Sequence, residues 1–383
     1  MMRKLPYGAN YLNWDDMVEL KSAIDQKILF RYQTESESLS TQFEHMASRQ
    51  FGASRALAVH NCTEALRLCL LSTRPSVGDI VYIPAVTFVA VAGAVLSCGL
   101  IPILVDVDED FALNASRLPS DAQRVIVAHM EGVVRPLPSG VPFMIEDAAQ
   151  SMGGRHDNGI SAGVAGYAGV FSFHHNKVLT SGEGGLILTN SDETWKILRQ
   201  YHDHGSTRTH GEYPVWDDNT FYGENFVTSE AIAAIQIQQL RHLDEILMGL
   251  ERGYRLLREQ IPDRTAFRVM ERRQGDVKVS IRLQFSTRDL RIRAEARLRE
   301  AKLPYWTLSR YFLPDHPVIR DRKSIYADGF PWSIASGALR MDYDFSPTKE
   351  RLERVICLVI SPELREAEQA DEASRFVRVL ETL

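Results

Sequence analysis

The sequence is poor in cysteine, and its few cysteines do not form a pattern typical of a disulfide framework or a metal site. Only Cys62, Cys69, Cys98 and Cys357 occur in 383 residues. Their spacing lacks the closely paired cysteines that hold zinc. Three of them lie in apolar segments, where free thiols are commonly buried. We therefore expect a protein of a reducing compartment, the cytoplasm, without a metal site.

The sequence also lacks an excess of positive charge. Its 44 Lys and Arg residues are outnumbered by 50 Asp and Glu residues, which gives a formal net charge of -6. The isoelectric point from the sequence is about 6.0. A mildly acidic chain has no general attraction for nucleic acid or for an anionic membrane surface. We expect neither as a partner.

Long uncharged runs are rare, and one of them raises the question of a membrane span. Residues 80–105 carry no charged side chain, and a helix crosses a bilayer with about 20 apolar residues. Pro84 and Pro102 argue against a single helix. Two buried strands, at 80–83 and 103–105, joined by a buried helix at 87–98, explain the run better. The first seven residues also lack the apolar stretch of a signal peptide.

Short apolar runs alternate with helical periodicity through most of the chain. This pattern predicts an α/β fold with a mainly parallel sheet covered by helices on both faces. Besides the two strands above, strands are expected at 55–59, 124–129, 143–147, 169–173 and 185–189. Helices are expected at 14–27, 63–71, 192–204 and, as one long region, 228–257.

The pattern changes near residue 250. Residues 277–285 alternate like a half-exposed strand, and helices are expected at 291–302, 349–359 and 364–383. We expect a large domain over residues 1–250 and a smaller C-terminal α+β domain over residues 251–383.

Polar and aromatic groups follow several of the expected strands, at the edge where ligands bind in an open parallel sheet. The sequence NCT at 61–63 follows the first strand and opens a helix, so its N–H groups and the Thr63 hydroxyl could hold a phosphate. Phe88 follows the second strand and offers a flat ring.

The fifth and sixth strands are followed by the groups with the most chemical potential. EDAAQ at 146–150 offers a carboxylate and an amide, and the segment after the sixth strand offers Ser172 and Lys177. A phosphate site, a flat ring, a carboxylate and a lysine together are what pyridoxal 5'-phosphate requires. The lysine forms the Schiff base, and the carboxylate keeps the pyridine nitrogen protonated.

Taken singly, these residues have ordinary explanations: a helix cap, a core ring, a turn carboxylate and a surface lysine. A serine near histidines also resembles part of a hydrolase triad, but no Gly-x-Ser-x-Gly surrounds Ser172. His174 and His175 are adjacent, so along a strand they would face opposite ways and make poor joint metal ligands. A nicotinamide enzyme is disfavoured because no Gly-x-Gly-x-x-Gly follows the first strand.

The set of motifs resembles the DegT/DnrJ/EryC1/StrS family. Its members are fold-type-I enzymes that depend on pyridoxal phosphate and are mostly sugar aminotransferases. The matching segments, in family order, are PAVTFV (84–89), VDVD (105–108), EDAAQ (146–150), FSFHHNK (171–177), GEGG (182–185) and GENFVTSE (223–230). The resemblance covers roughly residues 20–245, and the C-terminal third matches only in general character.

The resemblance implies roles for the residues around the cofactor ring. Lys177 would carry the cofactor as a Schiff base and then move protons between Cα of the amino donor and C4′ of the cofactor. Asp147 would pair with the pyridine nitrogen, and Gln150 would bond on the side of the ring hydroxyl. Phe88 would stack on the ring.

The resemblance also implies how the phosphate is held. Ser172 and the turn formed by Asn61, Cys62 and Thr63 would bind it, although the family usually has glycine where this chain has Cys62. Asn225 matches an asparagine that reaches the phosphate of the neighbouring subunit, which implies a homodimer with shared active sites.

Other matched positions lie in the vicinity of substrate or cofactor. His129 lies where the family often has a histidine, and His174 or His175 is expected to face the site while the other packs beneath it. Glu131 stands where many relatives carry an aromatic residue, and Val227 replaces a family arginine. These departures concern the substrate rather than the cofactor.

The activity implied by the resemblance is amino transfer from an amino acid, glutamate being the expected donor, to a keto group of a sugar or sugar-like acceptor or keto acid. Some relatives carry histidine at the position of Lys177 and act as dehydratases, so the lysine favours transamination. The alternative is a pyridoxal phosphate-dependent dehydratase, lyase or oxidase on the same scaffold, acting on a sugar or an amino-acid-derived substrate. A non-catalytic regulator that binds the cofactor is a further alternative.

Overall fold

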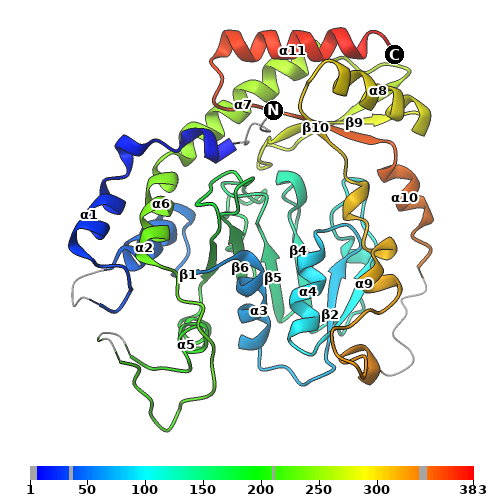
Figure 1. The fold of residues 1–383 in the computed structure, drawn as a ribbon. Coiled ribbons are helices and arrows are strands. Elements are labelled where there is room, and N and C mark those ends of the chain that lie inside the picture. Colours follow the sequence, from blue (N-terminus) through cyan, green and yellow to red (C-terminus); the bar gives the residue numbers. More distant parts are fainter. Residues whose placement is uncertain (1–6, 34–37, 209–210, 212, 336–342) are drawn as a thin grey trace.

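A seven-stranded sheet forms the centre of the structure, a computed structural model that describes residues 7–33, 38–208, 211, 213–335 and 343–383. The strand order is β1-β7-β6-β5-β4-β2-β3 (Figure 1). Their bounds are Arg55–Val59 (β1), Ile80–Pro84 (β2), Ile101–Val105 (β3), Arg124–Ala128 (β4), Phe143–Asp147 (β5), Ala168–Ser172 (β6) and Gly185–Thr189 (β7). Strand β7 runs antiparallel to both neighbours, and the other pairs are parallel. The mainly parallel sheet and its seven strands are thereby confirmed, each within two residues of its expected bounds.

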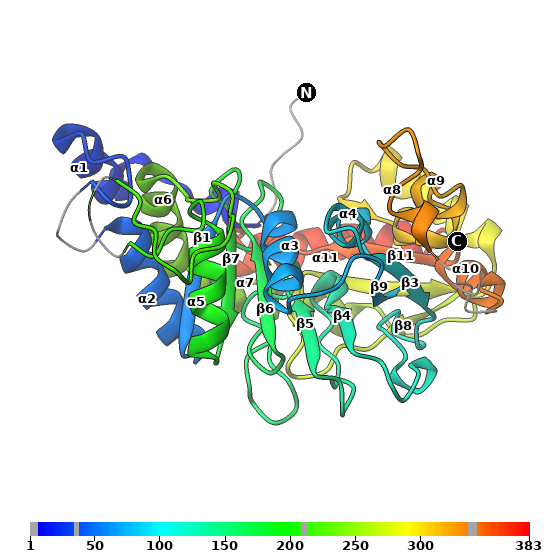
Figure 2. The same cartoon turned by 90° about the horizontal axis from the view of Figure 1, so that it is seen from below.

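Helices cover both faces of this sheet because successive side chains of a strand point to opposite sides. Their bounds are Val18–Gln26 (α1), Leu39–Phe51 (α2), Cys62–Ser72 (α3), Val89–Ser97 (α4), Asp192–Tyr201 (α5) and Glu230–Arg241 (α6). In β1, Ala56 and Ala58 belong to the core cluster that contains Phe43 of α2. Leu57 and Val59 belong to the cluster formed with α3 and α4, which lie on one side of the sheet in Figure 2. Each face therefore has its own apolar core.

A four-stranded antiparallel sheet lies at the upper end of the molecule in Figure 1. Its order is β10-β11-β9-β8, with bounds Phe267–Met270 (β8), Ser280–Phe285 (β9), Tyr305–Trp306 (β10) and Val355–Val359 (β11). The accompanying helices are Leu243–Gln260 (α7), Arg288–Glu300 (α8), Pro317–Arg320 (α9), Ser346–Leu352 (α10) and Glu366–Leu380 (α11). Short 3-10 segments occupy Tyr7–Tyr11 (η1), Trp14–Asp16 (η2), Ala115–Arg117 (η3), Met130–Gly132 (η4), Ser309–Tyr311 (η5), Leu313–Asp315 (η6) and Trp332–Ile334 (η7).

The structure corrects the expected helix at 349–359. Its first part is helical in α10, but Val355–Val359 forms strand β11, which pairs with both β9 and β10. The five residues of β11 are all buried. A short apolar run buried on both faces has no periodicity that separates strand from helix, so only its pairing partners decide.

Two expected helices are divided. The region 228–257 contains α6 and α7, which meet at His242. The region 14–27 contains η2 and then α1. The expected domain boundary at residue 250 falls inside α7, and Phe171 of the large sheet shares a core cluster with Ile281 of the small one. The division into two domains stays a prediction.

No helix in the described part of the chain is both long enough and apolar enough to cross a bilayer. The uncharged run at 80–105 instead forms β2, α4 and β3, with β2 and β3 in parallel register. This is the βαβ unit expected from its prolines and small residues.

A buried ion pair joins the N-terminal segment to the sheet. Both terminal nitrogens of the Arg31 guanidinium, Nη1 and Nη2, lie 2.5 Å from oxygens of Glu44, and the two side chains are 2% and 5% exposed. Glu44 Oε1 also accepts a hydrogen bond of 2.8 Å from the Ala58 N–H in β1. Because both charges are removed from water, each one depends on the other.

Replacing Glu44 by glutamine should therefore destabilise the fold by about 3–5 kcal/mol, since Arg31 would be left buried without its counter-charge. Urea unfolding followed by circular dichroism measures the change. The matched control is Arg55→Gln, which breaks an exposed pair with Asp192 and should leave the unfolding midpoint nearly unchanged. Equal midpoints for the two variants would contradict the role of the buried pair.

Candidate active site

The carboxyl ends of the parallel strands converge on a cavity of about 440 Å³. All predicted site residues except Glu131, His175 and Asn225 line it. The predicted residues that do line it are Asn61, Cys62, Thr63, Phe88, His129, Asp147, Gln150, Ser172, His174 and Lys177. Residues from five separate strand ends thus meet as the rule for open parallel sheets predicts.

One end of the cavity is suited to an anion. Helix α3 begins at Cys62, so the first N–H groups of the helix have no partner within it. The Asn61 side chain is engaged as the N-cap and accepts a 2.9 Å bond from the Glu64 N–H. Ser172 Oγ accepts a bond from the His174 N–H, which leaves its hydroxyl hydrogen to donate. The helix start, Thr63 and Ser172 can therefore bind an anion, while the Asn61 side chain holds the helix that does so.

Asp147 supplies a buried carboxylate. It is 9% exposed, and its Oδ1 accepts a 3.1 Å bond from the Ala149 N–H. Burial raises the pKa of Asp147, and the Ala149 N–H and the nearby Lys177 act against this rise. The Cys62 sulfur lies 3.9 Å from Asp147 Oδ1, at the position where the motif normally has glycine. A carboxylate with so few partners favours a ligand that brings a positive charge or an N–H donor.

Lys177 faces the same cavity. Burial lowers the pKa of its amino group, although the Asp147 carboxylate opposes the change. A lowered pKa increases the fraction of neutral amine, which is the nucleophilic form. Lys177 is thus suited to attack a carbonyl and to exchange protons.

Glu146 holds the end of β5 in place. Its carboxylate is fully buried and accepts five bonds: Nε2–H groups of His129 (2.9 Å) and His156 (2.8 Å), and N–H groups of Gly163, Ala165 and Gly166. Burial alone would raise its pKa, but the hydrogen bonds from the histidines and the backbone outweigh burial and lower it. Because Glu146 and Asp147 are neighbours in a strand, fixing one on its side of the sheet directs the other into the cavity.

His129, Glu146 and His156 also form a cluster of potential metal ligands, whose ligand atoms lie within 4.8 Å of one another. The ionised carboxylate only accepts hydrogen bonds, so both histidines present Nε2–H to it rather than a lone pair. Hydrogen bonding accounts for this arrangement. Residue spacing alone did not indicate His156, which comes from the loop between β5 and β6.

The two adjacent histidines do not behave as expected. They lie beyond β6 in a turn rather than along a strand, and His175 Nδ1 is 3.1 Å from His174 Nε2. Neither packs beneath the site, because His174 is only partly buried and His175 is exposed. His174 lines the cavity described above and His175 lines a second one. The GEGG segment at 182–185 is the turn into β7, as expected.

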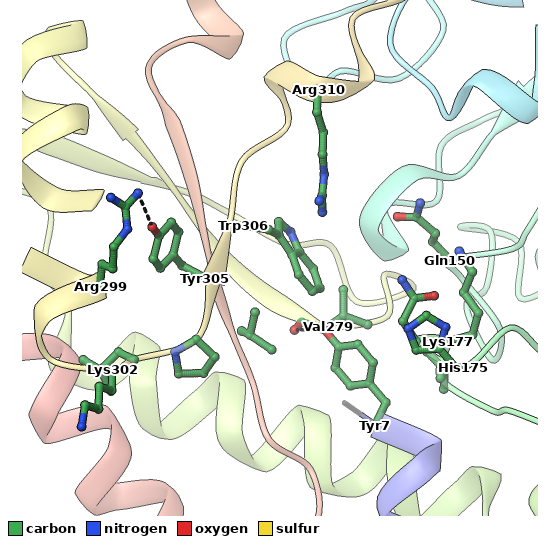
Figure 3. A pocket seen from close by; sticks show the side chains of 15 residues that line it. Tyr7, Gln150, His175, Lys177, Val279, Arg299, Lys302, Tyr305, Trp306 and Arg310 are labelled. Atoms are coloured by element: carbon green, nitrogen blue, oxygen red, sulfur yellow. Dashed lines mark hydrogen bonds between the residues drawn. The ribbon is translucent and has the colours of Figure 1, made fainter. Parts of the chain in front are cut away.

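The second cavity, of about 730 Å³, adjoins the first through Gln150, Asn176 and Lys177. Figure 3 shows it between Gln150 and Lys177 on one side and aromatic and cationic side chains on the other. These side chains are Tyr7 from the N-terminal segment and Tyr305, Trp306, Arg299, Lys302 and Arg310 from the C-terminal part. No acidic residue is among the described residues that line this cavity. The set was missed from the sequence because no motif connects these positions.

Segment η5, which carries Arg310, is tied to the loop after β2. The Thr87 N–H donates to the Tyr311 carbonyl (3.0 Å), and the rings of Phe88 and Tyr311 meet edge to face with centroids 6.4 Å apart. Phe88 is 54% exposed and lines the first cavity. The two cavities therefore share one wall and form a single candidate active site.

Comparison with known proteins assigns the chain to a family. The model of the DegT/DnrJ/EryC1/StrS aminotransferase family matches residues 19–371. The chain belongs to this family. The match extends beyond the motifs recognised in the sequence and includes the small sheet.

Individual relatives are more distant. The chain is 32% identical over 228 residues to an L-glutamine:2-deoxy-scyllo-inosose aminotransferase from Streptoalloteichus tenebrarius, which covers 55% of this chain and 53% of that protein. It is 32% identical over 228 residues to a GDP-perosamine synthase from Caulobacter vibrioides, covering 55% of this chain and 58% of that protein. The chain thus spans little more than half the length of these two curated relatives.

Solved structures of the same architecture cover the whole chain. A sugar aminotransferase from Micromonospora echinospora, CalS13, superposes with a TM-score of 0.79 at 21% identity, covering 100% of both chains. A GDP-4-keto-6-deoxy-D-mannose-3-dehydratase from E. coli superposes with a TM-score of 0.81 at 18% identity, covering 99% of this chain and 100% of that one. At such identities the likeness shows the fold.

Two residues marked by the family motifs lie outside the first cavity. Asn225 accepts a 3.2 Å bond from the Val227 N–H within its own loop, so its role toward a neighbouring subunit stays a prediction. Glu131 is 2% exposed, and its backbone N–H donates a 2.8 Å bond to Gln150 Oε1. Glu131 therefore contacts the site through Gln150 rather than by lining the first cavity.

Replacing Glu146 by glutamine should destabilise the protein by about 3 kcal/mol at neutral pH. The neutral amide would lack the negative charge to which the five donors are hydrogen-bonded. The folded pKa of Glu146 is lowered, so its contribution is complete above the unfolded value of about 4.3 and is lost as the pH falls below it. Urea titrations of wild type and variant should thus converge toward acidic pH. Glu109→Gln, an exposed control, should show no such convergence. A difference that grew on acidification would contradict the assignment.

Proposed function

We propose that the protein is a pyridoxal 5'-phosphate-dependent aminotransferase. The observation that carries this proposal is the placing of Lys177 and Asp147 in one cavity whose end is the start of helix α3. These groups match the aldehyde, the ring nitrogen and the phosphate of the cofactor in kind. Family membership supports the same activity.

The residues present fit the cofactor. Asp147 has a raised pKa caused first by burial, so a protonated ring nitrogen would supply the partner that the carboxylate lacks. The N–H groups at the start of α3, with Thr63 and Ser172, would hold the phosphate. Phe88 would stack on the ring, and Gln150, fixed by the Glu131 N–H, would present its amide nitrogen to the ring hydroxyl.

When bound, the cofactor supplies an acceptor for the electrons released at the Cα atom of the amino donor. Lys177 then acts as the base, because a neutral amine in a buried site can take the proton from that carbon and return it elsewhere. Asp147 keeps a proton on the ring nitrogen throughout. The walls of the second cavity exclude water and orient the substrate.

We propose glutamate or glutamine as the amino donor and a keto-sugar or related cyclic ketone as the acceptor. The names of two relatives mention glutamine with an inosose and GDP-perosamine, which supports this class. A cavity of about 730 Å³ beside Lys177 with aromatic and cationic walls is suited to a polar ring and to a carboxylate or phosphate. A keto acid is a smaller alternative acceptor.

A dehydratase on the same scaffold is the second candidate. The solved 3-dehydratase from E. coli is similar over nearly the whole chain, which favours it on fold alone. Lys177 favours amino transfer, because a lysine can release the aminated cofactor and bind it again. Detection of water loss from the acceptor, instead of an aminated product, would decide for the dehydratase.

We further propose a homodimer with shared active sites, working in the cytoplasm. The segment that precedes Asn225 carries Tyr213, Trp216 and Tyr222, which are 81%, 58% and 78% exposed. Large exposed aromatic rings on one segment are typical of a protein contact surface. All four cysteines are free, which is consistent with a reducing compartment.

Replacing Lys177 by alanine should lower the rate of amino transfer by about 10³-fold or more. It should also remove the visible absorbance band of the reconstituted enzyme. The control Lys196→Ala changes an exposed lysine of α5 and should retain both. Spectra recorded before and after addition of glutamate or glutamine, with product analysis, measure the effect. A Lys177→Ala enzyme that kept the same band, discharged by the donor, would overturn the assignment.

Replacing Asn225 by alanine should weaken cofactor retention by about tenfold, because one charge-assisted bond to the phosphate of the partner subunit would be lost. Asn219→Ala, a change at an exposed residue of the same segment, should retain the cofactor. Light scattering should give the mass of a dimer for wild type and both variants. A fully active monomer would refute the shared site.

A further inference from the structure

Glu131 is a buried carboxylate whose backbone has an unfavourable conformation. It is 2% exposed, and its backbone adopts φ 56° and ψ 32°, a left-handed conformation that is uncommon for residues other than glycine. The following Gly132 also has a positive φ of 78°, and a Cβ there would lie 2.1 Å from the Val277 carbonyl oxygen. A buried carboxylate in a strained turn persists where its contacts determine it fully.

The side chain of Glu131 reaches the small sheet. Its Oε1 accepts a 2.8 Å bond from the Trp306 indole N–H in β10 and a 2.5 Å bond from the Ser280 hydroxyl in β9. Its Oε2 lies 3.6 Å from Arg272 Nη2 and 3.9 Å from Arg282 Nε. Two buried cations thus face one oxygen, while the other oxygen is directed to Trp306.

The backbone of Glu131 reaches the opposite wall. Its N–H donates to Gln150 Oε1 at 2.8 Å, and its carbonyl accepts a 2.9 Å bond from Arg272 Nη1. Gln150 lines both cavities, and Trp306 lines the second one. One residue therefore holds groups on both sides of the candidate active site.

Trp306 is well placed to contact a substrate. Figure 3 shows its side chain in the second cavity, with Gln150 and Lys177 across from it. Tyr7 packs against the indole edge to face, with centroids 6.3 Å apart. The described structure gives the indole N–H one hydrogen-bond acceptor, Glu131, so this carboxylate, together with the Tyr7 ring, holds the indole in its orientation.

We propose that Glu131 is a positioning residue for the substrate: it fixes the Trp306 indole as the platform on which the acceptor ring lies. A sugar or cyclitol ring presents apolar C–H faces that pack on a flat aromatic surface, while its hydroxyls remain in the polar part of the cavity. The proposal rests on the proposed function for the identity of the acceptor. It does not depend on that function for the contact between Glu131 and Trp306.

The test is a double-mutant cycle on the reconstituted full-length enzyme. Glu131→Gln keeps the size of the side chain and the backbone N–H to Gln150 but removes the charge that faces Arg272 and Arg282. Some loss of stability is therefore expected, and KM is compared at a temperature at which circular dichroism shows every variant to be folded. We expect KM for a keto-sugar or inosose acceptor to rise about tenfold, as for loss of one hydrogen bond to a charged group, with kcat changed less than about threefold. Trp306→Phe should raise KM similarly, and the double variant should show no further rise.

Two controls separate positioning from general damage. Ser280→Ala removes the other hydrogen bond to the same oxygen without changing the contact with Trp306, and it should leave KM within about twofold. The fluorescence of Trp306 is obtained, for wild type and for each variant, by subtracting the spectrum of the same protein with Trp306→Phe added. It should shift in Glu131→Gln and not in Ser280→Ala. This readout needs no turnover.

The outcomes are distinct. Additive effects of Glu131→Gln and Trp306→Phe on KM, or an unchanged Trp306 emission in Glu131→Gln, would overturn the proposal. An equal rise of KM in Ser280→Ala would also overturn it, because any loss in the cluster would then suffice. Absence of amino transfer with every donor and acceptor would instead refute the proposed function, and the fluorescence result would still decide the role of Glu131.

Discussion

The candidate active site depends on one buried carboxylate that does not itself line the cavity. Glu146 collects five hydrogen-bond donors: from His129 directly after β4, from the His156 loop and from residues 163–166. The loop comes this close because Gly169 in β6 has no side chain, and a Cβ there would lie 2.1 Å from the Gly163 carbonyl oxygen. With Glu146 fixed, the strand pleat directs Asp147 to the other side, into the cavity. The position of Asp147 is thus set by its neighbour.

The electrostatics of the site follow from this placement. Asp147 and Lys177 are both shielded from water, and burial moves the pKa of Asp147 up and that of Lys177 down. Both shifts disfavour the charged forms, and a cationic ring beside Asp147 together with an aldehyde beside Lys177 would relieve this. The adjoining cavity has cationic and aromatic walls and, among the described lining residues, no acid. The proposed cofactor and substrate regions therefore differ in charge.

Much of the large sheet and of the first cavity could be predicted from particular residues of the sequence. The motif at 146–150, Lys177 and the turn at 61–63 identified the first cavity because each directly follows a strand, and the carboxyl ends of parallel strands meet. The expected helix at 349–359 was wrong in its second part, because β11 is an apolar run whose strand character depends on pairing with β9 and β10. His174 and His175 were misplaced because the strand ends at Ser172 and a turn brings their rings together.

The sequence by itself determined which residues line the first cavity, since those residues lie within a few positions of strand ends and their chemistry is local. Only the tertiary structure decided the other half. Glu131 is 149 residues from Ser280 and 175 residues from Trp306 along the chain. No spacing rule connects these positions. They meet because the small sheet packs against the turn after β4, and a buried carboxylate there needs donors that only that packing supplies.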